Sequence, residues 1–196
     1  MPEQPTSRPR IEGEREGEIF TAVVALLVEA GYDKLTFDAV ATAVRASKAT
    51  LYRRWPTKAG LVLAAFVEGT RHIAVDPDTG SLRSDLLALA GQISAHVNNH
   101  VGTIRAVLVE TSRSAELYAT MQEQFLDQRK ALMSHVLKRA AARGEIEASA
   151  ITEDLWDVLP GYLIYRSVLT GRPPSRRGIR DLVDNVLIPS LTRHNA

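Results

Sequence analysis

Cysteine is absent from the 196 residues of this sequence. Disulfides, thiolate metal ligands and cysteine nucleophiles are therefore excluded, and a chain without thiols suits a reducing cytoplasm. Long apolar runs are missing as well: the run from Ala22 to Val28, for example, is far too short to cross a bilayer. The N-terminal segment is polar and contains proline, unlike a signal peptide. We expect a cytoplasmic protein with no membrane association.

Catalytic signatures are also missing. The sequence contains no nucleophile elbow, no glycine-rich phosphate loop and no His-Glu metal motif. Asp154 and Asp157 could form an acid-base pair, but at a predicted helix start they more simply favour the helix dipole. The sequence therefore predicts no enzyme, no cofactor and no metal, and an enzyme or carrier built on a helical bundle stays the alternative.

Positive charge is concentrated in one short part of the chain. The formal net charge is only +1, yet the interval from Ala39 to Val67 contains five basic residues and no acid. The basic residues are Arg45, Lys48, Arg53, Arg54 and Lys58. Such a cluster is the electrostatic footprint of a nucleic-acid reader, although an isolated charge run is also typical of a solvated surface.

Residues 35–58 have the layout of two short helices joined by a four-residue turn. Thr36 is a suitable N-cap, and Phe37, Val40 and Val44 follow at the spacing of one buried helical stripe. This arrangement predicts a helix-turn-helix. A merely solvated basic helix would need neither the capped partner helix nor the tight turn.

The second helix of this motif is predicted to read DNA. Ser47 can cap it, Leu51 and Trp55 form its buried side, and Pro56 ends it. At about 100° per residue, this choice of buried side turns Arg53 outward. The predicted exposed side also carries Lys48 and Ala49 and Thr50 near its start, with Tyr52 and Arg54 on its flanks.

Helical periodicity continues through the rest of the chain. A first helix ends near Gly31, another begins after Thr57, and the turn-rich segment 76–80 precedes several further amphipathic helices. No strand pattern interrupts them. We therefore predict an all-α protein with a three-helix DNA-binding domain and a C-terminal helical ligand-binding and dimerisation domain. The predicted limits are a disordered arm at 1–13, a DNA-binding domain with connecting helix at 14–75 and the helical domain at 81–196.

The stretch from Ser47 to Lys58, SKATLYRRWPTK, resembles the recognition-helix signature of the TetR family of bacterial transcriptional regulators. Weaker resemblance continues through Ala142–Ile146 and Gly161–Gly171, so it covers nearly the whole chain. It implies an all-α homodimer that binds double-stranded operator DNA in the nucleoid and a small-molecule effector in its C-terminal domain. Effector pockets differ so much within the family that the resemblance does not imply the ligand.

Carried over residue by residue, the resemblance assigns Thr36, Tyr52 and Lys58 to phosphates. It assigns Lys48, Ala49 and Thr50 to bases. Arg53 and Arg54 follow from the helical geometry, and Ser47 is the N-cap that begins the matching stretch. One departure is Arg45, which stands where the turn usually has glycine. An arginine with positive φ is strained, so either the turn geometry differs or the strain accompanies a phosphate contact. Arg8 and Arg10 of the arm could reach phosphates or a minor groove, or simply decorate the terminus.

Candidate effector residues in the C-terminal domain combine apolar bodies with polar tips, which is typical of ligand cavities and also of ordinary cores. They are His96, His100, Arg105, Met121, Phe125, Trp156, Tyr162 and Tyr165. His96 and His100 also have metal-ligand spacing, but no carboxylate or cysteine pattern accompanies them. We expect polar-rim or pH-sensitive histidines instead.

The last two predicted helices carry dense apolar stripes, which favours a homodimer interface made by these helices. The alternative is that they complete the core of one protomer. The sequence predicts a repressor that releases a palindromic operator when a mostly apolar effector binds. A DNA-binding regulator without an effector stays open, as does activation in place of repression.

Overall fold

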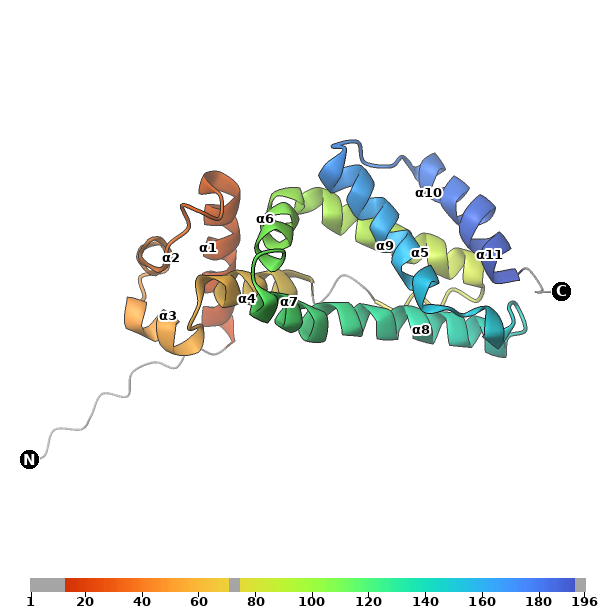
Figure 1. Cartoon of the computed structure of the whole chain (residues 1–196), viewed down its shortest axis with the longest axis horizontal. Helices are drawn as coiled ribbons and strands as arrows, with labels where there is room; N and C mark the ends of the chain where they lie inside the picture. Colours follow the sequence, from red (N-terminus) through yellow and green to blue (C-terminus); the bar gives the residue numbers. More distant parts are fainter. Residues whose placement is uncertain (1–12, 71–74, 193–196) are drawn as a thin grey trace, which may run out of the picture. The chain divides into compact units, whose positions relative to one another are not determined.

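The structure is a computed structural model of the chain and describes residues 13–70 and 75–192. All elements in these two ranges are helical (Figure 1), which confirms the predicted all-α fold class. Arg8 and Arg10 lie outside the described residues. The chain divides into two compact units, Met1–Glu68 and Gly69–Ala196.

The first unit contains the predicted helix-turn-helix. Its helices are α1 (Glu14–Ala30), α2 (Phe37–Ala43), α3 (Lys48–Arg54) and most of α4 (Lys58–Thr70). Thr36 and Ser47 cap α2 and α3, since Thr36 Oγ1 accepts from Ala39 N at 3.1 Å and Ser47 Oγ accepts from Thr50 N at 3.1 Å. The turn between the two helices is four residues long, as predicted.

Apolar side chains from all four helices form the core of this unit. Leu51 on α3 is fully buried, and Trp55, the residue after the end of α3, is 7% exposed. The Trp55 ring packs edge-on against Phe20, with ring centroids 5.5 Å apart. Burial of Leu51 and Trp55 fixes the rotation of α3 about its axis. Arg53 consequently faces solvent, as predicted from the sequence.

The second unit is a helical bundle. Its elements are α5 (Leu82–Asn99), α6 (Val101–Thr111), α7 (Ala115–Met121), η1 (Gln122–Leu126), α8 (Asp127–Ala142), η2 (Ala148–Ala150), α9 (Glu153–Ile164), η3 (Tyr165–Leu169), α10 (Arg176–Leu182), η4 (Val183–Leu187) and α11 (Ile188–Thr192). The elements η1, η3 and η4 are π-helical turns inside longer helical runs, whereas η2 is a short 3₁₀ helix. The run 115–142 is thus one long helix with a π turn in it.

The end of α8 is set by Gly144, which has φ 75°. Glu145 N donates to Ala140 O at 3.0 Å and Gly144 N donates to Ala141 O at 2.9 Å. This pair of bonds is the Schellman arrangement, in which a left-handed residue after the helix satisfies its last carbonyls. Glycine adopts this conformation without strain.

The core of the second unit lies among α5, α8, α9 and the helices after α9 (Figure 1). Its buried members include most of the stripe that the sequence suggested for dimerisation: Leu159, Leu163, Val168, Ile179, Val183, Leu187 and Leu191. These side chains contribute to the core of one protomer. That the last helices also form a homodimer interface stays a prediction. The large apolar side chains that stay exposed on the same helices are Tyr165, Leu169 and Val186.

An ionic cluster connects the segment before α5 to α8. The carboxylate of Asp85 is fully buried and accepts from Thr79 N and Thr79 Oγ1, both at 2.6 Å. Arg139 and Arg143 lie 3.4 and 3.3 Å from its second oxygen. Arg139 also holds Asp76 through two bonds of 2.6 and 2.7 Å. We call this cluster the ionic clasp; its members are too far apart along the chain for a local pattern to predict it.

The division between the two units falls inside α4, after Glu68. The sequence placed the joint later, in the turn-rich segment 76–80. One cause of the difference is that the last residue of α4, Thr70, accepts a hydrogen bond from Arg129 of α8, so the end of α4 packs with the second unit. The predicted limits 14–75 and 81–196 remain predictions.

Candidate nucleic-acid interface and effector region

The exposed face of α3 carries the predicted reading residues. Lys48, Ala49, Tyr52, Arg53 and Arg54 are all exposed, and Thr50 is partly exposed. Ser47 Oγ and Thr50 Oγ1 share a hydrogen bond of 2.6 Å at the start of the helix. Thr36 is exposed at the start of α2 and Lys58 is partly exposed at the start of α4. The structure therefore brings all ten predicted DNA-binding residues onto one helical unit with accessible side chains or caps.

Two acids from other helices engage the cations of α3. Lys48 Nζ donates to Asp38 of α2 at 2.7 Å, and this hydrogen bond raises the pKa of Lys48. Arg54 Nε donates to Glu16 of α1 at 3.0 Å. Both partners lie too far away along the chain, at 10 and 38 residues, for a local pattern to predict them. The acid-free interval is therefore partly neutralised in three dimensions.

Tyr52 and Lys58 are also held by neighbours. The Tyr52 ring stacks on Phe37 with centroids 4.0 Å apart. Lys58 Nζ donates to the carbonyl of Tyr32 at 2.9 Å and lies 4.1 Å above its ring. Arg53, in contrast, makes no side-chain hydrogen bond or ion pair with any residue that the structure describes. Its guanidinium is available for an external acceptor.

Arg45 occupies the left-handed position of the turn, with φ 50°. Ala46 N donates to Ala41 O at 2.9 Å and Arg45 N donates to Thr42 O at 3.3 Å, the same pattern that Gly144 makes after α8. Of the two possibilities left open by the sequence, the structure shows the usual turn geometry with a strained arginine. The Arg45 side chain is exposed and has no partner among the described residues.

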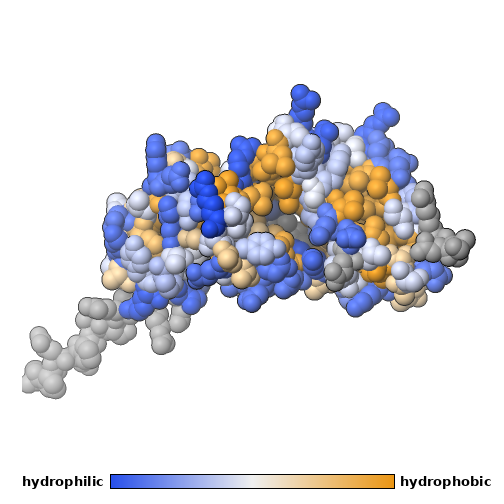
Figure 2. Space-filling model, viewed as in Figure 1, coloured by the Kyte–Doolittle hydropathy of each residue, from blue (hydrophilic) through white to orange (hydrophobic). Residues whose placement is uncertain are grey.

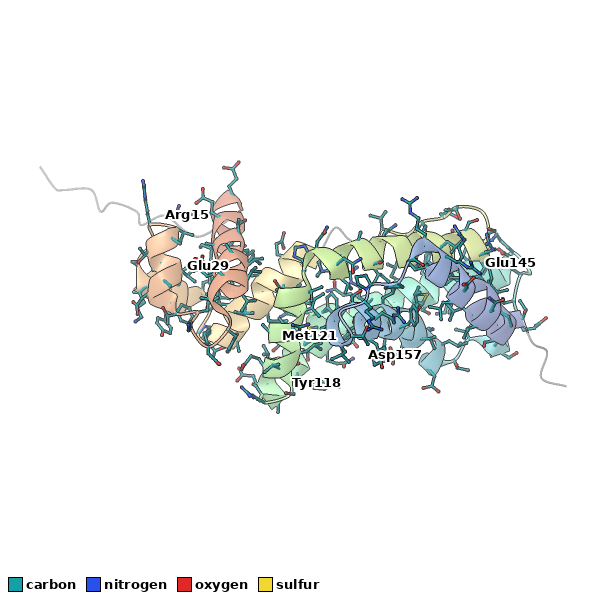
Figure 3. The ribbon with its side chains drawn as sticks, turned by 90° about the horizontal axis from the view of Figure 1, so that it is seen from above. Arg15, Glu29, Tyr118, Met121, Glu145 and Asp157 are labelled. Atoms are coloured by element: carbon teal, nitrogen blue, oxygen red, sulfur yellow. The ribbon has the colours of Figure 1, made fainter. Side chains whose placement is uncertain are left out.

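Arg15 of α1, labelled in Figure 3, supports this turn from outside. Its guanidinium donates to Val44 O at 2.7 Å and to Arg45 O at 3.3 Å. These carbonyls belong to the end of α2, where helical partners are missing. Arg15 is thus a positioning residue for the turn that the sequence analysis did not find, because no local pattern relates α1 to residue 45.

The predicted effector residues have several different sets of contacts within the second unit. His96 and His100 lie together, with ring centroids 4.5 Å apart. Phe125 lies in η1 under the guanidinium of Arg129, 5.1 Å from the ring centroid. Trp156 and Tyr162 pack partly buried against the core of the second unit, and Trp156 Nε1 is buried without an acceptor among the described residues.

The remaining predicted effector residues have different surroundings. Met121 is buried, Tyr165 is 56% exposed, and Arg105 donates to the carbonyl of Val168 at 2.7 Å. Arg129, which the sequence analysis did not name, has a readable signal, because it follows Phe125 by four residues on one helical run. In the described ranges, no group of three potential ligands could hold a metal ion, and no helix has the length and apolar character needed to span a bilayer.

Comparison with known proteins agrees with this arrangement. Residues 19–65 match the family described as "Bacterial regulatory proteins, tetR family", and residues 76–186 match "Tetracyclin repressor-like, C-terminal domain". An HTH-type transcriptional regulator of Mycobacterium tuberculosis is 56% identical over 91% of this chain and 89% of its own length. The chain belongs to the TetR family.

Two further relatives of this TetR-family regulator span almost its whole length. The DNA-binding transcriptional repressor TetR of Mycobacteroides abscessus is 31% identical over 89% of this chain and 92% of its own length. The crystal structure of the TetR-family transcription regulator SCO0332 has a TM-score of 0.71 and 30% identity, and the match covers 89% of this chain and 97% of that one. The chain is therefore a transcriptional regulator with an N-terminal helix-turn-helix, and not an enzyme.

Replacing Arg45 separates the strain of the turn from a DNA contact. We expect Arg45→Gly to be at least as stable as the wild-type TetR-family regulator, because glycine relieves the positive φ. Arg45→Ala keeps that φ and should be less stable than Arg45→Gly by about 1 kcal/mol in chemical denaturation. Both variants should lose operator affinity, with a salt slope shallower by about one. Unchanged affinity in both variants would show that Arg45 contacts no phosphate.

Proposed function

We propose that this TetR-family regulator is a ligand-responsive repressor that binds a palindromic operator as a homodimer. The observation that carries the proposal is the exposed face of α3, where Arg53 has no protein partner among the described residues. An uncommitted arginine on a helix of this kind fits the guanine edge in a major groove. As a DNA-binding repressor, the protein would act on the bacterial nucleoid.

In this proposal the two kinds of contact come from different parts of the unit. Lys48, Ala49, Thr50 and Arg53 would face bases, because small residues near the start of α3 allow close approach. The residues at the borders would contact phosphates: Thr36, Arg45, Ser47, Tyr52, Arg54 and Lys58. Lys48 and Arg54 would exchange Asp38 and Glu16 for DNA on binding.

The proposed dimer uses the surface of the last helices that the protomer leaves uncovered. Tyr165, Leu169 and Val186 are 56%, 71% and 45% exposed, and Figure 2 shows hydrophobic surface over α9 to α11. Apolar side chains of this size are expected to be covered in a stable homodimer. The buried stripe beneath them gives this surface a rigid base.

Selection of binding sites from random DNA with the purified protein tests the proposal. We expect a palindrome whose half-sites are about 34–36 Å apart, or a modest multiple of a helical turn. The mass measured by sedimentation should correspond to two chains bound to each operator. A monomer that binds a non-palindromic site with full affinity would overturn the dimer and the palindrome together.

The effector part is tested by reciprocity. A small molecule that weakens operator binding by some factor must bind the operator complex more weakly by the same factor. Hits from a thermal-shift screen should therefore be titrated with and without operator. If every hit binds equally in both states, the protein is a regulator without an effector among those compounds.

A further inference from the structure

Arg129 differs from Arg139 and Arg143, two further partly buried arginines of α8, in its binding partners. Arg139 and Arg143 each face carboxylates of the ionic clasp. Arg129 is partly buried, and among the described residues it contacts the carbonyl of Thr70 and the ring of Phe125 but no carboxylate. Burial lowers the pKa of Arg129 because nothing described offsets the loss of hydration. A partly buried cation without a counter-charge is a costly arrangement.

The Arg129 guanidinium has N–H donors that make no hydrogen bond to the described residues. Arginine presents five N–H groups in a fixed planar fork, and here one terminal nitrogen donates to Thr70 O. Stacking on Phe125 fixes the plane of the fork, because the ring centroid lies 5.1 Å from Arg129 Cζ. The other nitrogens have no acceptor within the described part of the chain. A preoriented fork of this kind matches the two oxygens of a carboxylate.

His96 lies within electrostatic reach of Arg129, and the ring of His100 lies against the ring of His96. Burial, His100 and Arg129 together lower the pKa of His96 to about 4, so its imidazole is neutral at neutral pH. No described carboxylate contributes to that shift. The rings of His96 and His100 are 4.5 Å apart and both remain partly exposed. The region thus brings together a guanidinium, two imidazoles and an aromatic ring, and no carboxylate of the described residues bonds to Arg129.

We propose that Arg129, together with His96 and His100, binds the carboxylate of an amphipathic organic acid whose apolar part lies against Phe125. This inference rests on the proposed function in taking the bound acid as the effector. One net cation fits a monoanionic head group, while an ammonium compound would be repelled. The sequence predicted a mostly apolar effector, and the carboxylate adds the polar group that orients it.

The position of Arg129 also connects this site to α4. Its guanidinium holds the main-chain carbonyl of Thr70, the last residue of the helix that begins at Lys58 beside the recognition helix. A carboxylate that binds the same guanidinium competes with the Thr70 carbonyl for it, or changes the direction in which the guanidinium donates to that carbonyl. Binding of the acid therefore changes how the end of α4 is held, which gives the effector a route toward the DNA-binding unit.

NMR titration of the full chain tests the site without knowledge of the natural effector. The probes are acetate, hexanoate and decanoate, with hexanamide as the uncharged match for hexanoate. The readout is the ring resonances of His96 and His100, assigned with His96→Gln and His100→Gln. We expect saturable shifts of both rings, affinity that rises with chain length, and binding of hexanamide at least about tenfold weaker than hexanoate.

Arg129→Met should weaken hexanoate binding by at least about tenfold, to the level of hexanamide. Arg129→Lys keeps the charge but loses the fork, so an intermediate affinity is expected. Arg113→Met is the matched control, because Arg113 is 67% exposed, and it should bind hexanoate like the wild type. If Arg129→Met does not fold, Arg129→Gln and the wild-type comparison of hexanoate with hexanamide decide the matter.

Three outcomes overturn the carboxylate site: no saturable shift with any of the acids, equal affinity for hexanoate and hexanamide, or full hexanoate affinity in Arg129→Met. Operator release is measured separately by fluorescence anisotropy. An acid that binds through Arg129 without weakening operator binding supports the site and contradicts its role as the effector site. A neutral compound that releases the operator equally from wild type and Arg129→Met supports the proposed function and contradicts the carboxylate inference.

Discussion

Asp85→Ala is expected to destabilise this regulator by about 3 kcal/mol, because removing a buried carboxylate leaves the buried donors that it satisfies without an acceptor. Asp85 is fully buried and joins Thr79 to Arg139 and Arg143. Its loss would free Thr79 in the segment before α5 and remove the carboxylate that Arg139 and Arg143 share, although Asp76 and Glu145 would still pair with them. Urea denaturation of the full chain measures the change as a lower midpoint.

Asp184→Ala provides the control for that prediction. Asp184 makes two bonds of 2.7 and 2.8 Å with Arg83, but the two side chains are 38% and 50% exposed. A surface pair of this kind contributes about 0–1 kcal/mol. Equal destabilisation by Asp85→Ala and Asp184→Ala would contradict the assignment of the clasp as the stronger connection.

The clasp also predicts the sign of an acid effect. Burial raises the pKa of Asp85, but hydrogen bonds from Thr79, Arg139 and Arg143 outweigh it and leave the pKa below the ordinary 3.8. A lowered folded-state pKa means that the carboxylate stabilises the fold fully above the unfolded value and stops doing so as the pH falls through the folded value. The stability difference between wild type and Asp85→Asn should therefore shrink only below about pH 4.

The helix-turn-helix could be predicted from the sequence because its determinants are local. Thr36 and Ser47 each cap a helix by accepting from the main-chain N–H three residues further along. Pro56 ends the second helix. Burial of Leu51 and Trp55 then sets which side chains face outward. Each of these signals acts within one or two helical turns, so periodicity and capping rules were sufficient.

The partners of the exposed cations could not be predicted in the same way. Glu16 meets Arg54 across 38 residues, and Arg15 meets Val44 across 29. The arginine–carboxylate pairs of the clasp join residues that are 54 to 63 positions apart. Such pairs depend on how helices pack, and a single sequence does not show which residues of two distant helices lie side by side.

The apolar stripes of the last helices show a second property that a single sequence does not predict. Their periodicity correctly predicted helices with a buried face, but it did not say which neighbour buries that face. The structure shows that Leu159, Leu163 and Val183 are fully buried by their own protomer. A period of 3.6 residues identifies a buried stripe and leaves its partner unspecified.

Arg53→Ala is expected to change which DNA sequences the regulator prefers. Arg53 is exposed on α3 and has no partner among the described residues, so no internal contact is lost when it is removed. If it binds a guanine through two hydrogen bonds, its loss costs about 1–3 kcal/mol at that base pair. Affinity for the selected operator should fall by roughly ten- to a hundredfold, while affinity for operators altered at that position changes much less.

Lys58→Ala gives the contrasting pattern. A phosphate contact carries affinity but little sequence information, so this variant should weaken binding to all sequences nearly alike, with a shallower salt slope. Lys58 also holds Tyr32 inside the protein, so thermal melting must accompany its binding curves. Arg177→Ala, at a side chain that is 84% exposed in the second unit, should bind like the wild type. If Arg53→Ala and Lys58→Ala produce the same sequence-independent loss, Arg53 contacts the backbone, and base reading belongs to Lys48, Ala49 and Thr50 at the start of α3.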